Sequence, residues 1–202
     1  MTQNKPIRIA LTGRMRSGKS TIADHLWLKY DFAKVSFGSP IRRIADEYFS
    51  HLYEEVTEVC EFTGLETKKE RKPRALLQNI GQLLRQIDED VWIKQAESSV
   101  EVWQNYRDVH GIVIDDLRQP NEYEWARENN FVIIRVEADE AMRLRRSEQE
   151  GDSFNEEDLT HDTEQHSDNF SVDYTITNDG DLDELERQVD EIMSDIKAKG
   201  GR

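Results

Sequence analysis

The chain has 202 residues, enough for one compact domain with a substantial core, although only 36% of them are hydrophobic. A formal net charge of -15 disfavours a general binder of nucleic acids or anionic membranes. The single cysteine, Cys60, rules out an internal disulfide or a thiolate zinc cage within one chain, and no apolar run reaches the ~18 residues of a membrane span. We therefore expect a cytoplasmic protein, either a monomer or a homodimer.

The first elements are predicted to be a strand, a loop and a helix. Ile7 to Thr12 is a short apolar run without a helical period, which indicates a strand. The next apolar side chains recur at helical spacing: Ile22, Ala23, Leu26 and Tyr30. A second brief strand is expected at Ala33 to Phe37, with a helix after it from about Pro40 to Leu52.

The middle of the chain is mainly helical in pattern. Glu54 to Lys72 carries charge, one glycine and weak helical character, and we interpret it as a mobile insertion. Two helices are predicted after it, at Arg74 to Ile87 and Val91 to Tyr106. Their apolar stripes are expected in the core: Leu76, Leu77, Ile80, Leu83, Leu84 and Ile87, then Trp92, Ala96, Ser99 and Trp103.

The last third alternates buried strands and helices. Strands are expected at Gly111 to Ile114, Phe131 to Val136 and Tyr174 to Thr177. Helices are expected at Asn121 to Asn129 and, with a basic character, at Asp139 to Glu148. A polar segment, Gly151 to Ser171, follows the basic helix. The closing helix has one apolar face: Leu182, Leu185, Val189, Ile192 and Ile196.

Five strands alternating with helices predict an α/β fold in three layers, with a five-stranded parallel sheet covered on both faces. We expect one domain over residues 1–202. Within it, residues 38–106 form a helical acceptor-binding region, and residues 139–171 form a helical lid. Ligands of such sheets bind at the carboxyl ends of the strands.

A phosphate-binding loop is the strongest signal in the sequence. Residues 13–20, Gly-Arg-Met-Arg-Ser-Gly-Lys-Ser, fit the pattern G-x-x-x-x-G-K-[ST] between a predicted strand and a predicted helix. Lys19 is expected to reach the β- and γ-phosphates of ATP, and the Ser20 hydroxyl to ligate Mg²⁺. The predicted donor site comprises Gly13, Arg14, Met15, Arg16, Ser17, Gly18, Lys19, Ser20 and Thr21.

Arginines at three places could bind acceptor phosphate or neutralise the transferred group. Arg118 lies two residues beyond Asp116, at the carboxyl end of a strand. One of Asp115 and Asp116 could hold Mg²⁺ through water or help to bind the acceptor, and the other could cap the next turn. The other cations are Arg42 with Arg43 and a helical cluster: Arg143, Arg145 and Arg146. The cluster resembles a kinase lid, and ion pairing with Glu140, Glu148 or Glu150 is the alternative.

Several segments in order along the chain resemble the phage-type deoxynucleoside monophosphate kinases, which are close in fold to dephospho-CoA and adenylate kinases. The matching segments are the loop at 13–20, Phe37-Gly38-Ser39-Pro40-Ile41-Arg42, Leu77-Gln78-Asn79-Ile80-Gly81 with Asp88 to Trp92, Asp116-Leu117-Arg118-Gln119-Pro120-Asn121-Glu122, His161-Asp162-Thr163-Glu164 and Asn178-Asp179-Gly180. Gly38-Ser39 departs from the small-then-acidic pair of that family, and the acceptor base stays open.

The resemblance implies site roles for individual residues. Arg42, Arg118 and Arg85 would contact the acceptor phosphate, and Gln78 and Gln82 would lie near the acceptor base. Asp115 is placed in the same acceptor site by its position at the end of a predicted strand, and not by the resemblance. Asn178 and Gly180 would lie near the donor purine. The predicted catalytic residues are Lys19, Asp116, Arg118, Arg143 and Arg146.

The sequence thus predicts ATP- and Mg²⁺-dependent phosphorylation of a nucleoside or deoxynucleoside monophosphate. Two alternatives stay open. One is a related small-molecule kinase, such as one acting on a hydroxyl of dephospho-CoA, for which Asp115 could be the base. The other is a nucleotide-binding regulatory module with little or no hydrolysis. A regulatory GTPase is disfavoured because the segment 177–180 lacks the lysine of a base-reading motif.

Overall fold

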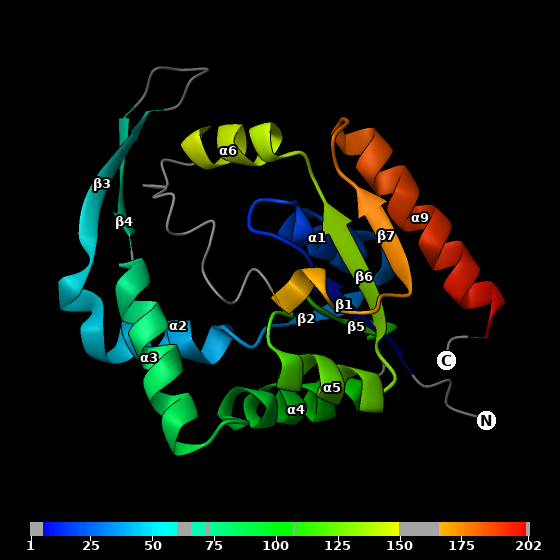
Figure 1. Ribbon diagram of the computed structural model, residues 1–202, viewed down its shortest axis with the longest axis horizontal. Helices are drawn as coiled ribbons and strands as arrows, with labels where there is room; N and C mark the ends of the chain where they lie inside the picture. The colour runs from blue at the N-terminus through cyan, green and yellow to red at the C-terminus, as the bar shows by residue number, and fades with distance from the viewer. Residues whose placement is uncertain (1–5, 60–65, 72, 107, 150–165, 201–202) are drawn as a thin grey trace. The chain divides into compact units, whose positions relative to one another are not determined.

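The computed structural model describes residues 6–59, 66–71, 73–106, 108–149 and 166–200 (Figure 1). Its contacts divide the chain into two compact units. One consists of residues 1–36 and 96–202, and the other of residues 37–95. None of the helices in the described ranges combines the length and apolar character that a membrane crossing needs.

The first unit is built on a five-stranded parallel sheet, which confirms the predicted fold class. The strand order is β2-β5-β1-β6-β7, so β1 lies at the centre. Parallel pairing joins every neighbouring pair in the sheet. The strands are β1 (Ile7–Thr12), β2 (Phe32–Val35), β5 (Gly111–Ile114), β6 (Val132–Glu137) and β7 (Tyr174–Thr177).

Helices cover both faces of this sheet, since alternate side chains of each strand point to opposite sides. On one face α1 (Lys19–Tyr30) and α9 (Leu182–Ala198) share a core with Ile9, Leu11 and other strand residues. In Figure 1, α5 (Pro120–Glu128) and the part of α4 (Val91–Gln104) that belongs to this unit, from Ala96 onward, lie along the other side of the sheet from α9. The helix α6 (Glu140–Gln149) follows β6 directly.

The second unit is mostly helical. It contains α2 (Ser39–Phe49), the short 3₁₀ turn η1 (Ser50–Leu52), α3 (Arg74–Ile87) and the first residues of α4. The helices α2 and α3 pack on each other. The indole Nε1 of Trp92 donates to the carbonyl oxygen of Gly81 at 3.2 Å, which ties the start of α4 to α3.

Two paired strands lie in the segment for which the sequence indicated weak helical character, so that indication was wrong; its interpretation as a mobile insertion stays a prediction. The strand β3 (Glu54–Val59) pairs antiparallel with β4 (Glu66–Arg71), from Glu54↔Arg71 to Val59↔Glu66. Charged residues make up half of β3 and most of β4, and Lys68 pairs with Glu55 at 2.6 Å. A charged ribbon of this kind has no apolar period by which the sequence could indicate a strand.

Several residues expected in the core are exposed instead. Ile80 of α3 is buried, but Leu83 and Ile87 are 59% and 82% exposed. Trp103 near the end of α4 and Leu182 at the start of α9 are 37% and 53% exposed. Helical spacing predicted the correct helices, but it gave too wide a buried face because the ends of a helix can extend beyond what it packs on.

Candidate functional site

The loop between β1 and α1 has the backbone that its glycines allow. Gly13 and Gly18 have φ angles of 132° and 103°, in the region that side chains rarely adopt. A Cβ on Gly13 would lie 2.2 Å from the carbonyl oxygen of Val136 in β6, so Gly13 also permits the loop to pack against the sheet. Arg16, with φ 62°, completes the turn.

The side chain of Lys19 folds back onto the start of this loop. Its Nζ donates to the carbonyl oxygens of Gly13 and Arg14, each at 2.7 Å, and the residue is only 7% exposed. Ser17 is fully buried, and its hydroxyl has no hydrogen-bond partner within the described part of the chain. Ser20, on the first turn of α1, is exposed. The loop therefore places an ammonium group, a helix N-terminus and an accessible hydroxyl together, which suits a phosphate chain.

Two of the three arginines in the α6 cluster lie on the loop. Arg143 is 5% exposed, and its Nη1 lies 3.5 Å from the carbonyl oxygen of Met15. Arg146 donates to the carbonyl oxygen of Arg16 at 3.4 Å. The Nε of Arg143 is buried and has no partner among the described residues. Arg145, in contrast, is exposed.

Asn178, at the end of β7, contacts both the loop and α6. Its Nδ2 donates to the carbonyl oxygen of Ser17 at 2.8 Å. Arg146 Nη2 donates to the carbonyl oxygen of Asn178 at 3.1 Å and to its Oδ1 at 3.3 Å. Gly180, two residues later, is exposed. Of the two residues expected near the donor purine, Asn178 is thus in contact with the phosphate loop.

The segment after β5 docks on the end of β1. Leu117 N donates to the carbonyl oxygen of Leu11 at 3.2 Å, and the Thr12 hydroxyl donates to the carbonyl oxygen of Leu117 at 3.1 Å. The Asp116 carboxylate accepts a hydrogen bond from the Ser36 hydroxyl at 2.7 Å. These contacts hold Asp116 and Arg118 at the carboxyl edge of the sheet, in the same unit as the phosphate loop.

Glu122 is a positioning residue that the sequence analysis did not identify. It is 3% exposed, and its Oε2 accepts from the backbone N–H groups of Arg118 and Gln119, each at 3.0 Å. Gln119 and Glu122 form a capping box at the start of α5. The spacing of Gln119 and Glu122, with Pro120 as the first helical residue, was the available signal.

Arg135 was also missed. It lies within a mostly buried strand, and its Nη2 donates to the carbonyl oxygens of Ser167, Asp168 and Phe170 at 3.2, 3.2 and 2.6 Å. Asp168 in turn pairs with Arg14 of the phosphate loop at 2.8 Å. An arginine inside an apolar strand is uncommon, and this was the signal for it.

A cavity of about 340 Å³ lies beside the phosphate loop, at the base of α6. It is lined by Gly13, Arg14, Arg135, Val136, Glu137, Ala138, Glu140, Arg143 and Asp168. Three guanidinium groups and three carboxylates therefore border one space. Of the predicted lid, the structure describes α6 and the residues from 166 onward; His161 to Glu164 lie outside the described residues.

The predicted acceptor residues of the second unit lie on two packed helices. Arg42 is on α2, while Gln78, Gln82 and Arg85 are on α3. Arg42 and Gln82 are exposed, and Gln78 and Arg85 are half-buried. Their roles at an acceptor stay predictions, as do those of Asp115 and Thr21.

Solved structures with this fold include kinases. A crystal structure of TT1252 from Thermus thermophilus is 18% identical, with a TM-score of 0.58, covering 95% of this chain and 98% of the other. Shikimate kinase from Acinetobacter baumannii in complex with shikimate is 12% identical, with a TM-score of 0.51, covering 97% and 96%.

APS kinase from Mycobacterium tuberculosis in complex with AMPPNP and APS is also 12% identical, with a TM-score of 0.52, covering 95% of this chain and 99% of the other. No curated protein matches the sequence significantly. The family model described as AAA domain matches residues 9–168, from β1 to the segment beside the phosphate loop. The chain therefore belongs to the AAA domain family and has the three-layer α/β fold of small P-loop kinases.

Proposed function

We propose that the protein transfers the γ-phosphoryl group of ATP to the phosphate of a nucleoside or deoxynucleoside monophosphate. The observation that carries this proposal is the convergence of Lys19, Arg143 and Arg146 on one glycine-shaped loop. A loop that only held a nucleotide would not need two further guanidinium groups at its mouth. Charge stabilisation of a transferred phosphoryl group does need them.

The chain's own residues would act mainly by positioning. Backbone N–H groups of the loop and Lys19 bind the triphosphate, and Arg143 and Arg146 offset the charge that develops on the transferred group. Closure of α6 over the phosphates would exclude water, whose attack would waste the triphosphate. Transfer is direct and in line, without a covalent enzyme intermediate.

The donor set fits Mg²⁺ carried by the phosphates. Ser20 presents an exposed hydroxyl immediately after Lys19, and Mg²⁺ is usually held by substrate phosphates and one or two protein oxygens. When bound, the ion would neutralise charge on the phosphate oxygens. Ser20 is the protein ligand we propose.

The segment after β5 supports a phosphate as the acceptor. A phosphate acceptor requires a fixed cation, and Glu122 fixes the backbone of Arg118 by accepting its N–H group. The resemblance to phage-type deoxynucleoside monophosphate kinases points to the same acceptor class. The bound AMPPNP and APS of the APS kinase structure support a two-ligand site on this fold.

A hydroxyl acceptor is the second candidate, because Asp115 and Asp116 place two carboxylates at the end of β5 where a base would be needed. Replacing Arg118 by Ala distinguishes a phosphate acceptor from a hydroxyl acceptor. It should mainly raise the acceptor KM if the acceptor is a phosphate. With a hydroxyl acceptor, Asp115→Asn should instead lower kcat.

A coupled assay with Mg-ATP and a panel of nucleoside and deoxynucleoside monophosphates tests the proposal. We expect acceptor-dependent ADP release with at least one member, and its loss in Lys19→Ala. Absence of turnover with every member, in folded protein, would refute the proposal. Slow ATP hydrolysis that no acceptor changes would indicate a nucleotide-binding regulatory module.

A further inference from the structure

Resting on the proposed function, we propose that Gln188 of α9 is a positioning residue for the donor nucleotide, although it lies far from the phosphate-binding motif in sequence. It would act through a short segment, residues 177–179, which we call the β7 junction. The junction connects α9 with the phosphate loop and with α6.

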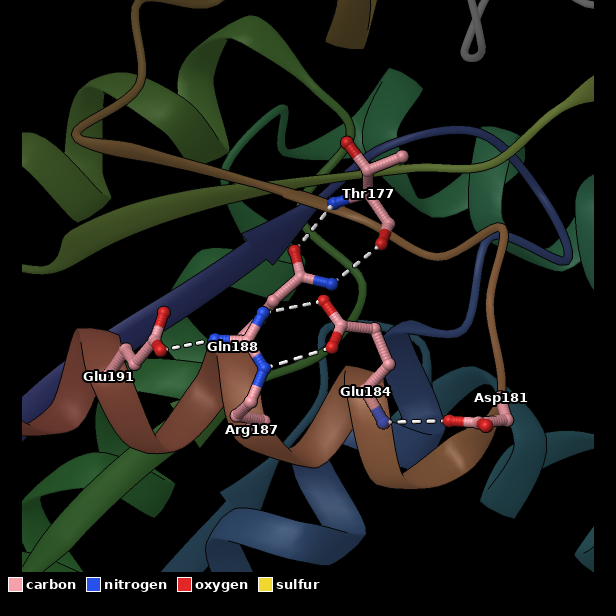
Figure 2. A network of polar contacts seen from close by, with 6 residues as sticks. All are labelled: Thr177, Asp181, Glu184, Arg187, Gln188 and Glu191. Atoms are coloured by element: carbon pink, nitrogen blue, oxygen red, sulfur yellow. Dashed lines mark hydrogen bonds and ion pairs between the residues drawn. The ribbon is translucent and has the colours of Figure 1, made fainter.

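Gln188 substitutes for a neighbouring strand at the end of β7. The backbone N–H of Thr177 donates to Gln188 Oε1 at 3.2 Å, and Gln188 Nε2 donates to the carbonyl oxygen of Thr177 at 2.9 Å (Figure 2). In the sheet β7 is an edge strand, and β6 is its one neighbouring strand within the described ranges. The side-chain amide therefore binds both polar backbone groups of one edge residue, and this fixes the point where β7 ends.

The two residues after Thr177 connect the end of β7 to the phosphate loop and to α6. Asn178 donates to the carbonyl oxygen of Ser17 in the loop, and accepts from Arg146 of α6. Asp179 Oδ1 accepts from the backbone N–H of Asp139, immediately before α6, at 2.6 Å. Three consecutive residues thus contact α9, the phosphate loop, Arg146 of α6 and the residue immediately before α6.

The neighbouring residue in α9 supplies a matched control. Arg187 makes contacts of comparable number, but its partners, Glu184 and Glu191, lie on the same helix (Figure 2). Helix α9 itself is capped by Asp181, whose Oδ1 accepts from Glu184 N at 2.9 Å. Loss of Arg187 would therefore disturb α9 without releasing β7.

Gln188→Met retains the length and the apolar stem of the side chain, but neither donates to nor accepts from Thr177. The end of β7 would gain freedom, and Asn178 would hold the Ser17–Gly18 turn less closely. We expect the Kd for Mg-AMPPNP to rise about five- to tenfold, corresponding to the loss of one or two hydrogen bonds. In Arg187→Met it should stay within about twofold of the wild type.

Calorimetric titration of Mg-AMPPNP into the wild type and both variants measures the Kd of each protein. Hydrogen exchange of the Thr177 and Asn178 amides shows whether the end of β7 has become more mobile. Faster exchange at these amides and weaker binding, in Gln188→Met alone, would support the inference. Equal Kd values for the two variants, or unchanged exchange at 177–178, would overturn it. If Gln188→Met does not fold, Gln188→Glu provides the same test, because its carboxylate accepts from Thr177 N–H but cannot donate to the carbonyl.

These outcomes are separate from those of the proposed function. Nucleotide binding without turnover of any monophosphate would refute the proposed reaction and still decide the role of Gln188. A wild-type protein that binds no nucleotide would refute both.

Discussion

The side chain of Asn178 occupies the space that a β-carbon on Gly18 would need. A Cβ built on Gly18 would lie 2.2 Å from Asn178 Nδ2, and Gly18 itself has φ 103°. Two independent constraints, one steric and one conformational, therefore require glycine at the last turn of the loop before Lys19. The second glycine of the motif thus permits the packing of Asn178 in addition to the positive φ angle of the loop.

We expect Gly18→Ala to destabilise the protein by about 2–3 kcal/mol and to abolish nucleotide binding, because the backbone strain adds to the displacement of Asn178. Urea unfolding and Mg-AMPPNP titration measure the two effects. Gly180→Ala is the stability control, since its Cβ would meet the Glu184 side chain only at 3.4 Å, an ordinary contact. A Gly18→Ala protein as stable as Gly180→Ala would contradict this account.

Glu122→Ala should weaken both stability and acceptor binding. The backbone N–H groups of Arg118 and Gln119 lose their buried acceptor, which costs about 1–3 kcal/mol of unfolding free energy. Arg118 then becomes less fixed, and under the proposed function the acceptor KM should rise while the ATP KM changes little. Steady-state kinetics with each substrate varied in turn separates the two constants.

The exposed Glu124 on the same helix provides the comparison. Glu124→Ala should leave both the unfolding free energy and the acceptor KM close to the wild-type values. Equal effects from the two substitutions would show that α5 contributes through its overall charge and not through the capping contact.

The phosphate loop and the five strands were predictable because their physical requirements are local. Gly13 and Gly18 permit a backbone that few residues adopt, and the apolar run of β5, for example, has only one reasonable position, inside a sheet. The pairing of β3 with β4 was not predictable in this way, since both strands are rich in charge and lack an alternating apolar face.

Contacts between residues distant in sequence could not be predicted from the sequence. Arg14 pairs with Asp168, and Asn178 with Ser17, across more than 150 residues of chain. Sequence spacing placed Arg143, Arg145 and Arg146 on one helix, but the direction of each side chain depends on the tertiary position of α6. Only the structure separates the two arginines on the loop from the exposed one.

The different roles of the buried Arg143 and the exposed Arg145 can be tested by substitution. Under the proposed function, Arg143→Met should lower kcat about 10²-fold or more, because a buried guanidinium at the phosphate loop would contribute most when charge develops in the transition state. Arg145→Met, on the exposed side of the same helix, should keep kcat within about twofold. Acceptor-dependent ADP release measures both. An equal loss in the two variants would indicate that the cluster acts by net charge alone.

A polar cluster behind the phosphate loop joins α1 to α9. The carboxylate of Asp190 accepts from His25 Nε2 at 2.9 Å, Lys29 Nζ at 2.6 Å and the Tyr30 hydroxyl at 2.7 Å. Burial alone would raise the pKa of Asp190, but these three hydrogen bonds hold it well below its usual range. Burial and then the hydrogen bond to Asp190 raise the pKa of Tyr30 to about 12.

A carboxyl group whose pKa is lower in the folded than in the unfolded state stabilises the fold above the unfolded pKa of about 3.9, and loses this contribution as the pH falls toward the folded pKa. Asp190→Asn should therefore cost about 1–2 kcal/mol at pH 7. The difference in unfolding free energy between wild type and Asp190→Asn should become progressively smaller below pH 4. Urea unfolding of both proteins from pH 7 to pH 3 measures it.

Two further charged residues lie beside the Asp190 cluster. Glu186 lies 3.3 Å from His25 Nδ1, and Lys197 lies over the Tyr30 ring. Both remain in Asp190→Asn, so they affect wild type and variant alike. Glu191→Gln, which removes an exposed carboxylate of α9 that pairs with Arg187 on the same helix, should give no comparable pH-dependent gap. A gap for Asp190→Asn that stays constant from pH 7 to pH 3 would mean that the residue contributes by packing and not by its charge.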